Sequence, residues 1–153
     1  MQAAPASPAR YGGFWIRVVA TLIDFIAISI VTLPVSVIIR VLTGIAGHAV
    51  AMPTPGVEAA SLIISGSFDA LATWLYAALL ESSSYQATLG KMALGLKVTD
   101  LDGHRISFAR ATGRHFAKLL SICFFIGFIM VGFTRFKQGL HDMVAGTLVI
   151  RAM

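Results

Sequence analysis

The sequence predicts an all-α membrane protein with two transmembrane helices, a third apolar segment and a small cytoplasmic β-hairpin. Three observations predict this class. Hydrophobic residues make up 57% of the 153 residues and charged residues only 12%, a balance outside the range of ordinary soluble domains. Two apolar runs are long enough to cross a bilayer, and Lys and Arg concentrate in the segments around them. A chain of this length has room for one membrane domain.

The first half of the chain contains both predicted transmembrane helices. Residues 1–13 form a tail that is too polar for the apolar region of a signal peptide. Residues 14–39 form the first helix, because the run is long enough for the hydrocarbon core. Residues 40–58 contain Gly, Pro and His without a sustained apolar period, so we expect a loop. Residues 59–81 form the second helix, with Asp69 near its centre.

The next segment, residues 82–118, is polar and basic, which is typical of a cytoplasmic loop. Within it "GLKVTDLDGHRIS" alternates on both sides of an Asp-Gly dipeptide and predicts a β-hairpin, because Gly accepts the positive φ of a tight turn. Arg110, Arg114 and Lys118 then recur every four residues and share one face of a helix. We expect this helix to lie on the membrane surface, with the three cations in contact with anionic lipid headgroups.

The third apolar segment, residues 119–134, is short for a span. If it crosses the membrane, eight Lys and Arg lie inside and four outside; if it returns to the same side, the division is eleven to one. The positive-inside rule therefore favours a re-entrant hairpin, with a third full span as the alternative, and a cytoplasmic N-terminus. The C-terminal motif, residues 135–153, contains the strand-like "GTLVIR", which can pair with "GLKVTD" if both lie on one side.

Three segments, "YGGFWIRVVATLID", "ATLGKMALGLKVTDLDGHRISFARA" and "KQGLHDMVAGTLVI", resemble the RDD family of bacterial membrane proteins, named for one arginine and two aspartates. The resemblance implies that these motif residues are Arg17, Asp24 and Asp142. It also implies a multi-pass protein of the bacterial inner membrane, for which transport of a small ligand or exchange of cations for protons is the usual suggestion.

The charged residues within the helices allow two interpretations. An ionised carboxylate at the depth of Asp24 costs on the order of 3 kcal/mol, so this group must be protonated, paired or in contact with water. Asp69 belongs to a stripe of small or polar residues at four-residue spacing, which is Ser61, Ser65, Asp69, Thr73, Ala77 and Glu81. Asp24 and Asp69, with Glu81 at the mouth, form one candidate pathway for protons or small cations. The other interpretation is that they hydrogen-bond neighbouring helices.

The first and last residues of the family motif, Arg17 and Asp142, have charged side chains for which the sequence suggests partners. Arg17 lies at the start of the first helix, where it either extends to the headgroups or pairs with Asp142. His141 and Asp142 are adjacent and point about 100° apart on a helix, and no nucleophile is placed to complete a triad. The sequence therefore predicts no enzymatic activity.

Other ligand classes are also not expected. The positive charge falls in loops beside apolar runs rather than in a nucleic-acid-binding pattern. The four histidines lack metal-ligand spacing, and the Asp-x-Asp-Gly stretch lacks the other ligands of a calcium loop, so we expect neither metal nor cofactor. Two functions remain: a small transporter or ion exchanger, expected to form a homo-oligomer in the lipid bilayer, and an accessory or assembly subunit of a larger membrane complex.

Overall fold

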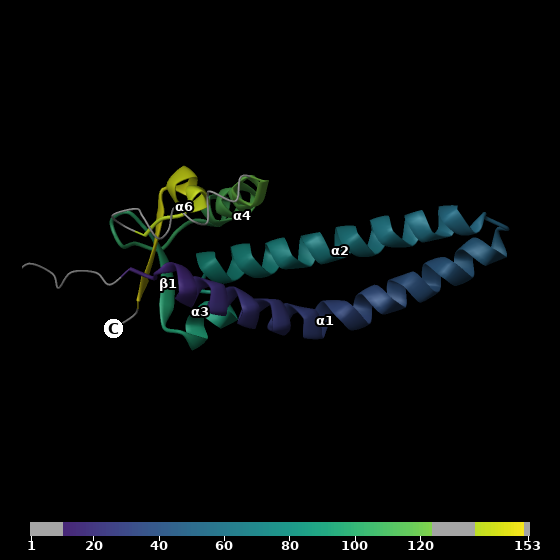
Figure 1. The fold of residues 1–153 in the computed structure, drawn as a ribbon, viewed down its shortest axis with the longest axis horizontal. Coiled ribbons are helices and arrows are strands. Elements are labelled where there is room, and N and C mark those ends of the chain that lie inside the picture. The colour runs from purple at the N-terminus through teal and green to yellow at the C-terminus, as the bar shows by residue number, and fades with distance from the viewer. Residues whose placement is uncertain (1–10, 124–136, 152–153) are drawn as a thin grey trace, which may run out of the picture. The chain divides into compact units, whose positions relative to one another are not determined.

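The computed structural model describes residues 11–123 and 137–151. The chain forms α1 (Phe14–Ala49), α2 (Thr54–Ser82), α3 (Leu89–Ala93), β1 (Leu96–Asp100), α4 (Phe108–Cys123), α6 (Leu140–Ala145) and β2 (Thr147–Arg151), as Figure 1 shows. It divides into two compact units, which are residues 25–76 and a second unit that joins residues 1–24 to 77–153. Most of the third apolar segment, predicted as a re-entrant hairpin or a third span, lies outside the described residues.

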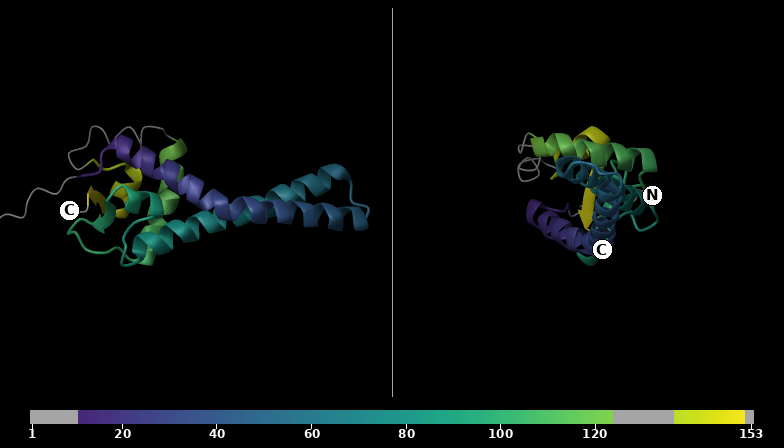
Figure 2. Two further views of the ribbon diagram at one scale, coloured as in Figure 1. Left: turned by 90° about the horizontal axis from the view of Figure 1, so that it is seen from below. Right: turned by 90° about the vertical axis from the view of Figure 1, so that its right-hand side faces the viewer.

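Two helices, α1 and α2, are long and apolar enough to cross a membrane, as the sequence predicts. Both extend into the predicted loop at 40–58, of which only residues 50–53 lie between them. Pro55 is tolerated because it stands in the first turn of α2, where a backbone N–H has no partner within the helix. Gly47 allows close approach, since a Cβ at this position would lie 2.3 Å from the Cγ2 of Val57. Figure 2 shows these parts of the two helices running side by side.

The strands form an antiparallel pair, with Leu96 opposite Arg151 and Asp100 opposite Thr147. This confirms the pairing of "GLKVTD" with "GTLVIR". The predicted β-hairpin is wrong, because the chain after the Asp-Gly turn forms no strand at residues 104–107. Only the turn itself forms: the Asp100 N–H donates to the carbonyl of His104 over 2.9 Å.

Other segments occupy the outer edges of both strands. On β1, the Val98 N–H donates to the carbonyl of Gln86 over 2.7 Å. On β2, the Gly12 N–H donates to the carbonyl of Val149 over 2.8 Å, and Tyr11 forms a bridge with Ile150. Residues 11–12 and the segment before α3 thus take the positions that a further hairpin strand would need.

Helices α4 and α6 pack against each other beside this sheet (Figure 1). Helix α6 ends at Ala145 and is followed by Gly146, whose φ of +58° is left-handed and favours a residue without Cβ. Helix α4 contains the predicted amphipathic segment and buries Ala111, Arg114 and Ala117 on one side. An arginine on the buried side of a helix requires a charged partner.

Candidate functional site

Arg114 on α4 stands between two buried carboxylates. Its side chain is only 2% exposed, and its Nη1 lies 2.7 Å from Oε2 of Glu81 near the end of α2. Its Nε and Nη2 both lie 2.8 Å from Oδ1 of Asp142 on α6. The planar guanidinium, with donors on two sides, suits such bridging. Three helices that are far apart in sequence are therefore joined through one side chain.

Arg17 on α1 contacts the other oxygen of Asp142. Its Nη1 donates to Oδ2 of that carboxylate, its Nε donates to the carbonyl of Gly12 over 2.8 Å, and its Nη2 donates to the carbonyl of Lys137 over 2.6 Å. Asp142 also accepts from the Gly139 N–H over 3.2 Å, which satisfies the start of α6. Of the two alternatives expected for Arg17, the structure shows the pairing with Asp142, which connects the start of α1 to the C-terminal motif.

Lys91 on α3 contacts the remaining side of Glu81. Its Nζ donates to Oε1, and Glu81 is only 1% exposed. Lys118 on α4 lies further out, with its Nζ 3.8 Å from the same oxygen and its side chain 30% exposed. We call Glu81, Asp142, Arg17, Lys91 and Arg114 the ion-pair cluster; Lys118 lies at its edge.

Burial and charge together set the protonation of these groups. Burial opposes the charge of Arg114, but Glu81 and Asp142 raise the pKa of the guanidinium above its ordinary value. Burial likewise opposes the charge of Asp142, yet Arg114 and Arg17 hold its pKa well below the usual range. Both groups are therefore charged at neutral pH, because opposite charges surround each of them.

Two neighbouring bases have depressed pKa values. Burial lowers the pKa of Lys91 to about 8, although Glu81 opposes the shift. Burial lowers the pKa of His141 to about 3, although Asp142 opposes it, so the imidazole is neutral at pH 7. The cluster thus has little capacity to take up further protons near neutral pH.

Asp24 is held by the start of α3. Its Oδ2 accepts from the Thr88 hydroxyl over 2.6 Å, and its Oδ1 accepts from the Gly90 N–H over 2.7 Å. These donors precede or belong to the first turn of α3, where backbone N–H groups lack partners within the helix. Gly90 leaves the required space, because a Cβ there would lie 2.0 Å from the carbonyl oxygen of Ala20. The "TLGK" stretch therefore docks α3 on the first motif aspartate.

Asp69 lies in the other unit, with different neighbours. Its Oδ1 accepts from the Ser36 hydroxyl on α1 over 2.6 Å. One turn earlier on α2, Ser65 is fully buried, and its hydroxyl has no hydrogen-bond partner in the part of the chain that the structure describes. Among the described residues no Lys, Arg or His forms an ion pair with Asp69. This carboxyl is in a polar but uncharged environment.

The structure divides the predicted site residues among several environments. Arg17 and Asp142 join Glu81 in the ion-pair cluster, Asp24 caps α3, and Asp69 bonds to Ser36. The prediction that Arg114 contacts lipid headgroups is wrong, because its side chain is buried between two carboxylates. Arg110 is half-exposed with its Nη1 3.8 Å from Oδ2 of Asp100, and Lys118 is partly exposed.

Sequence reasoning missed the roles of Arg114 and Lys91. A four-residue spacing of cations suggested one exposed stripe, but Ala111 and Ala117, three residues on either side of Arg114, are buried with it. Small residues at these positions leave room for a long side chain, and they were the feature of the sequence from which the burial of Arg114 could have been predicted. Lys91 had a weaker signal, as a single lysine between Gly90 and an apolar residue.

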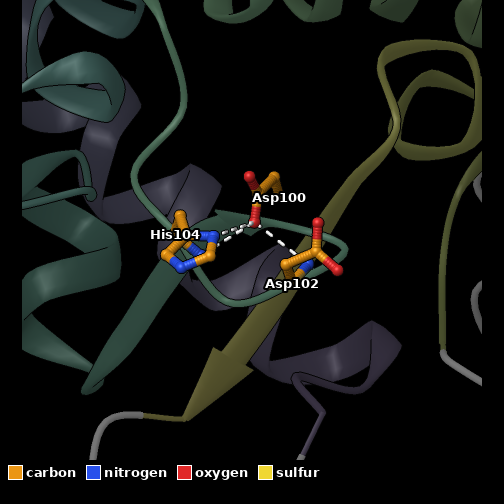
Figure 3. A group of neighbouring side chains, drawn as sticks. All are labelled: Asp100, Asp102 and His104. Carbon is orange, nitrogen blue, oxygen red and sulfur yellow. Dashed lines mark hydrogen bonds and ion pairs between the residues drawn. The ribbon is translucent and has the colours of Figure 1, made fainter.

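A group of potential metal ligands lies at the turn after β1, where Asp100, Asp102 and His104 lie close together (Figure 3). The Oδ1 of Asp100 accepts from the Asp102 N–H over 3.0 Å and from the His104 N–H over 2.7 Å. These bonds are typical of an Asx turn. The group therefore closes the loop, and its central oxygen already has two donors.

The chain is similar to several known proteins. The RDD family model matches residues 11–146. A protein named "Uncharacterized protein YxaI" from Bacillus subtilis is 40% identical, over 90% of this chain and 95% of that protein. "Uncharacterized membrane protein YteJ" from the same organism is 31% identical, over 92% of this chain and 80% of that protein. No solved structure matches. The chain belongs to the RDD family, a family of membrane proteins.

Proposed function

We propose that this chain is a multi-pass protein of the bacterial cytoplasmic membrane that carries protons or small cations across the bilayer as a homo-oligomer. Eleven of the twelve Lys and Arg residues fall in the unit of residues 1–24 and 77–153, and only Arg40 falls between them. The positive-inside rule then assigns this unit, with the N-terminus, to the cytoplasm. Several chains are needed because the two long apolar helices found among the described residues do not by themselves enclose a pathway.

The observation that carries the proposal is the environment of Asp69. A carboxyl group inside an apolar helix is costly unless it has a role or a partner. Asp69 has a hydroxyl partner in Ser36, and the buried hydroxyl of Ser65 one turn away is available as a second oxygen ligand. A carboxyl that is bonded to a neutral donor can release a proton or accept a cation without breaking an ion pair.

The other two acids of the predicted pathway are less suited to this role. Glu81 contacts two cations in the ion-pair cluster, and loss of its charge would leave Arg114 and Lys91 without that partner. Asp24 accepts two hydrogen bonds that hold α3. We therefore assign the exchanging group to Asp69 and give Asp24 and Glu81 positioning roles.

The test is proton and cation flux in proteoliposomes, with wild type and Asp69→Asn at equal incorporation. Asp69→Asn keeps the shape and polarity of the side chain but removes the titrating group, so flux should be abolished. Glu58→Gln is the matched control, because Glu58 is an exposed acid on the same helix, and it should conduct as wild type does. An inactive wild type would refute transport by this chain alone; an active Asp69→Asn would refute the role of Asp69.

A second candidate function, an accessory subunit of a larger membrane complex, rests on a different observation. A Cβ added at Gly66 on α2 would meet no atom within 4 Å, and Gly66 and Ala70 are exposed small residues four apart. This spacing is typical of faces where another membrane helix approaches closely. Gly66→Leu should then release a partner during co-purification in mild detergent, whereas Ser67→Leu, about 100° around the helix, should retain it. Equal retention in both would argue against this function.

We also propose that the chain has no enzymatic activity. Among the described residues, His141 is a histidine with a buried carboxylate partner, its Nε2 lying 3.5 Å from Oδ1 of Asp142. That carboxylate is already bound by Arg17 and Arg114. With its pKa lowered to about 3 by burial, His141 is a weak base at neutral pH.

A further inference from the structure

The ion-pair cluster contains more positive than negative charge. Its two carboxylates, Glu81 and Asp142, carry −2 in total. Arg17, Lys91 and Arg114 carry +3, and Lys118 at the edge makes +4, so the group as a whole has an excess of +2. Excess charge beside buried groups is unfavourable unless a counter-charge lies close by.

The chain offers little to balance this excess. It has seven acidic residues in all. Besides the two in the cluster, Asp24 binds the start of α3, Asp69 and Glu58 belong to the other unit, and Asp100 and Asp102 belong to the turn after β1. Residues 119–136 contain no Asp or Glu. An external anion is the simplest source of the missing charge.

Lys118 is the place where such an anion can reach the cluster. Its side chain is 30% exposed, whereas those of Arg114 and Lys91 are 2% and 11% exposed. The Nζ atoms of Lys118 and Lys91 both contact Oε1 of Glu81, so the two ammonium groups converge on one point. An anion bound at Lys118 would lie beside the positive charge that Glu81 leaves unbalanced.

The surroundings of Lys118 favour a lipid as the source of this anion. Helix α4 exposes the large aromatic side chains of Phe108 and Phe116 along its length, with Phe116 on a different side of the helix from Lys118. A helix that presents aromatic and cationic side chains together is typical of the membrane interface. Phosphate suits the site because its oxygens accept several charge-assisted hydrogen bonds from ammonium groups.

We propose that the phosphate of an anionic phospholipid headgroup binds at Lys118, on the exposed edge of the ion-pair cluster. The proposed site uses one of the three cations of the α4 stripe and not all of them. Arg114 is excluded by burial, and Arg110 faces Asp100. Lys91 adds positive charge near the proposed phosphate site, because its Nζ contacts the same Glu81 oxygen as the Nζ of Lys118. The bound lipid neutralises part of the excess charge.

The test is native mass spectrometry of the delipidated full-length protein titrated with phosphatidylglycerol. A single lysine near a membrane surface corresponds to roughly a fivefold change in affinity. Lys118→Gln should weaken phosphatidylglycerol binding by about that factor, and Lys118→Arg should restore it. Lys97→Gln is the matched control, because Lys97 is an exposed lysine on β1 outside the cluster, and it should bind as wild type does.

Separate arms distinguish the source of the phosphate. Phosphatidylcholine has the same phosphate with a neutral headgroup overall, and it should bind more weakly than phosphatidylglycerol. Inorganic phosphate at the same concentration should not displace the lipid. The proposal is overturned if Lys118→Gln binds phosphatidylglycerol as tightly as Lys97→Gln does, if both lipids bind equally, or if inorganic phosphate displaces the lipid.

Discussion

Replacement of Arg114 by methionine would remove the guanidinium that contacts both buried carboxylates. Methionine keeps the unbranched apolar stem of arginine but is shorter and uncharged, so the substitution removes the charged contacts while retaining an apolar side chain at this buried position. Glu81 would retain Lys91 and the edge contact with Lys118, and Asp142 would retain Arg17. Removal of one partner from a buried ion pair costs about 3–5 kcal/mol. Because the remaining cations compensate in part, we expect the lower half of that range.

The assay is reversible unfolding in mixed detergent micelles, monitored by circular dichroism. Arg110→Met is the matched control, because Arg110 lies one turn away on α4, is 46% exposed and has only a 3.8 Å ion pair with Asp100. An exposed pair of this kind contributes about 0–1 kcal/mol. If Arg114→Met destabilised the protein no more than Arg110→Met does, the assignment of Arg114 to the core of the cluster would be refuted.

Two other predictions concern groups near the cluster. His141 has its pKa lowered to about 3 from its ordinary 6.5, so below pH 6.5 the unfolded state binds the extra proton first. Stability should fall by up to about 1.4 kcal/mol per pH unit as pH drops, and unfolding titrations between pH 5 and about 6.5 should show a smaller slope for His141→Asn. Gly90→Ala would place a Cβ 2.0 Å from the carbonyl oxygen of Ala20 and should destabilise by about 1–3 kcal/mol or more. Gly113→Ala, where a Cβ meets no atom within 4 Å, should be neutral or slightly stabilising; equal losses in the two glycine variants would contradict the packing of α3.

The sequence was sufficient to predict the elements with a strong local or compositional signal. The two apolar helices follow from long runs with few charges, and the β1–β2 pair follows from two short β-branched segments. The helix ends were less predictable, because Gly47 and Pro55 have the same local signal in a loop as in a helix. The close approach of Val57 to Gly47, which leaves no room for a Cβ there, is a tertiary contact that the local sequence does not reveal.

The sequence identified the motif residues of the candidate site, but it did not predict most of the contacts between them and their neighbours. Arg17 and Asp142 are 125 residues apart, and their pairing was one of two alternatives for Arg17, the other being extension to the lipid headgroups. Arg114 was assigned to the surface because spacing identifies a helix face but not which face is buried. The hairpin prediction was wrong for a similar reason. The Asp-Gly dipeptide indicates a turn from local sequence alone, but which strand pairs with β1 is decided by the distant C-terminal strand β2.

The most direct test of the structural role of the family motif is a double-mutant cycle between Arg17 and Asp142. Unfolding free energies are measured for wild type, Arg17→Gln, Asp142→Asn and the double variant in the same micelles. Because the two side chains share a buried ion pair, we predict a coupling energy of about 2 kcal/mol. Additive losses, with a coupling below about 0.5 kcal/mol, would contradict the account that this pair holds the start of α1 to the C-terminal motif.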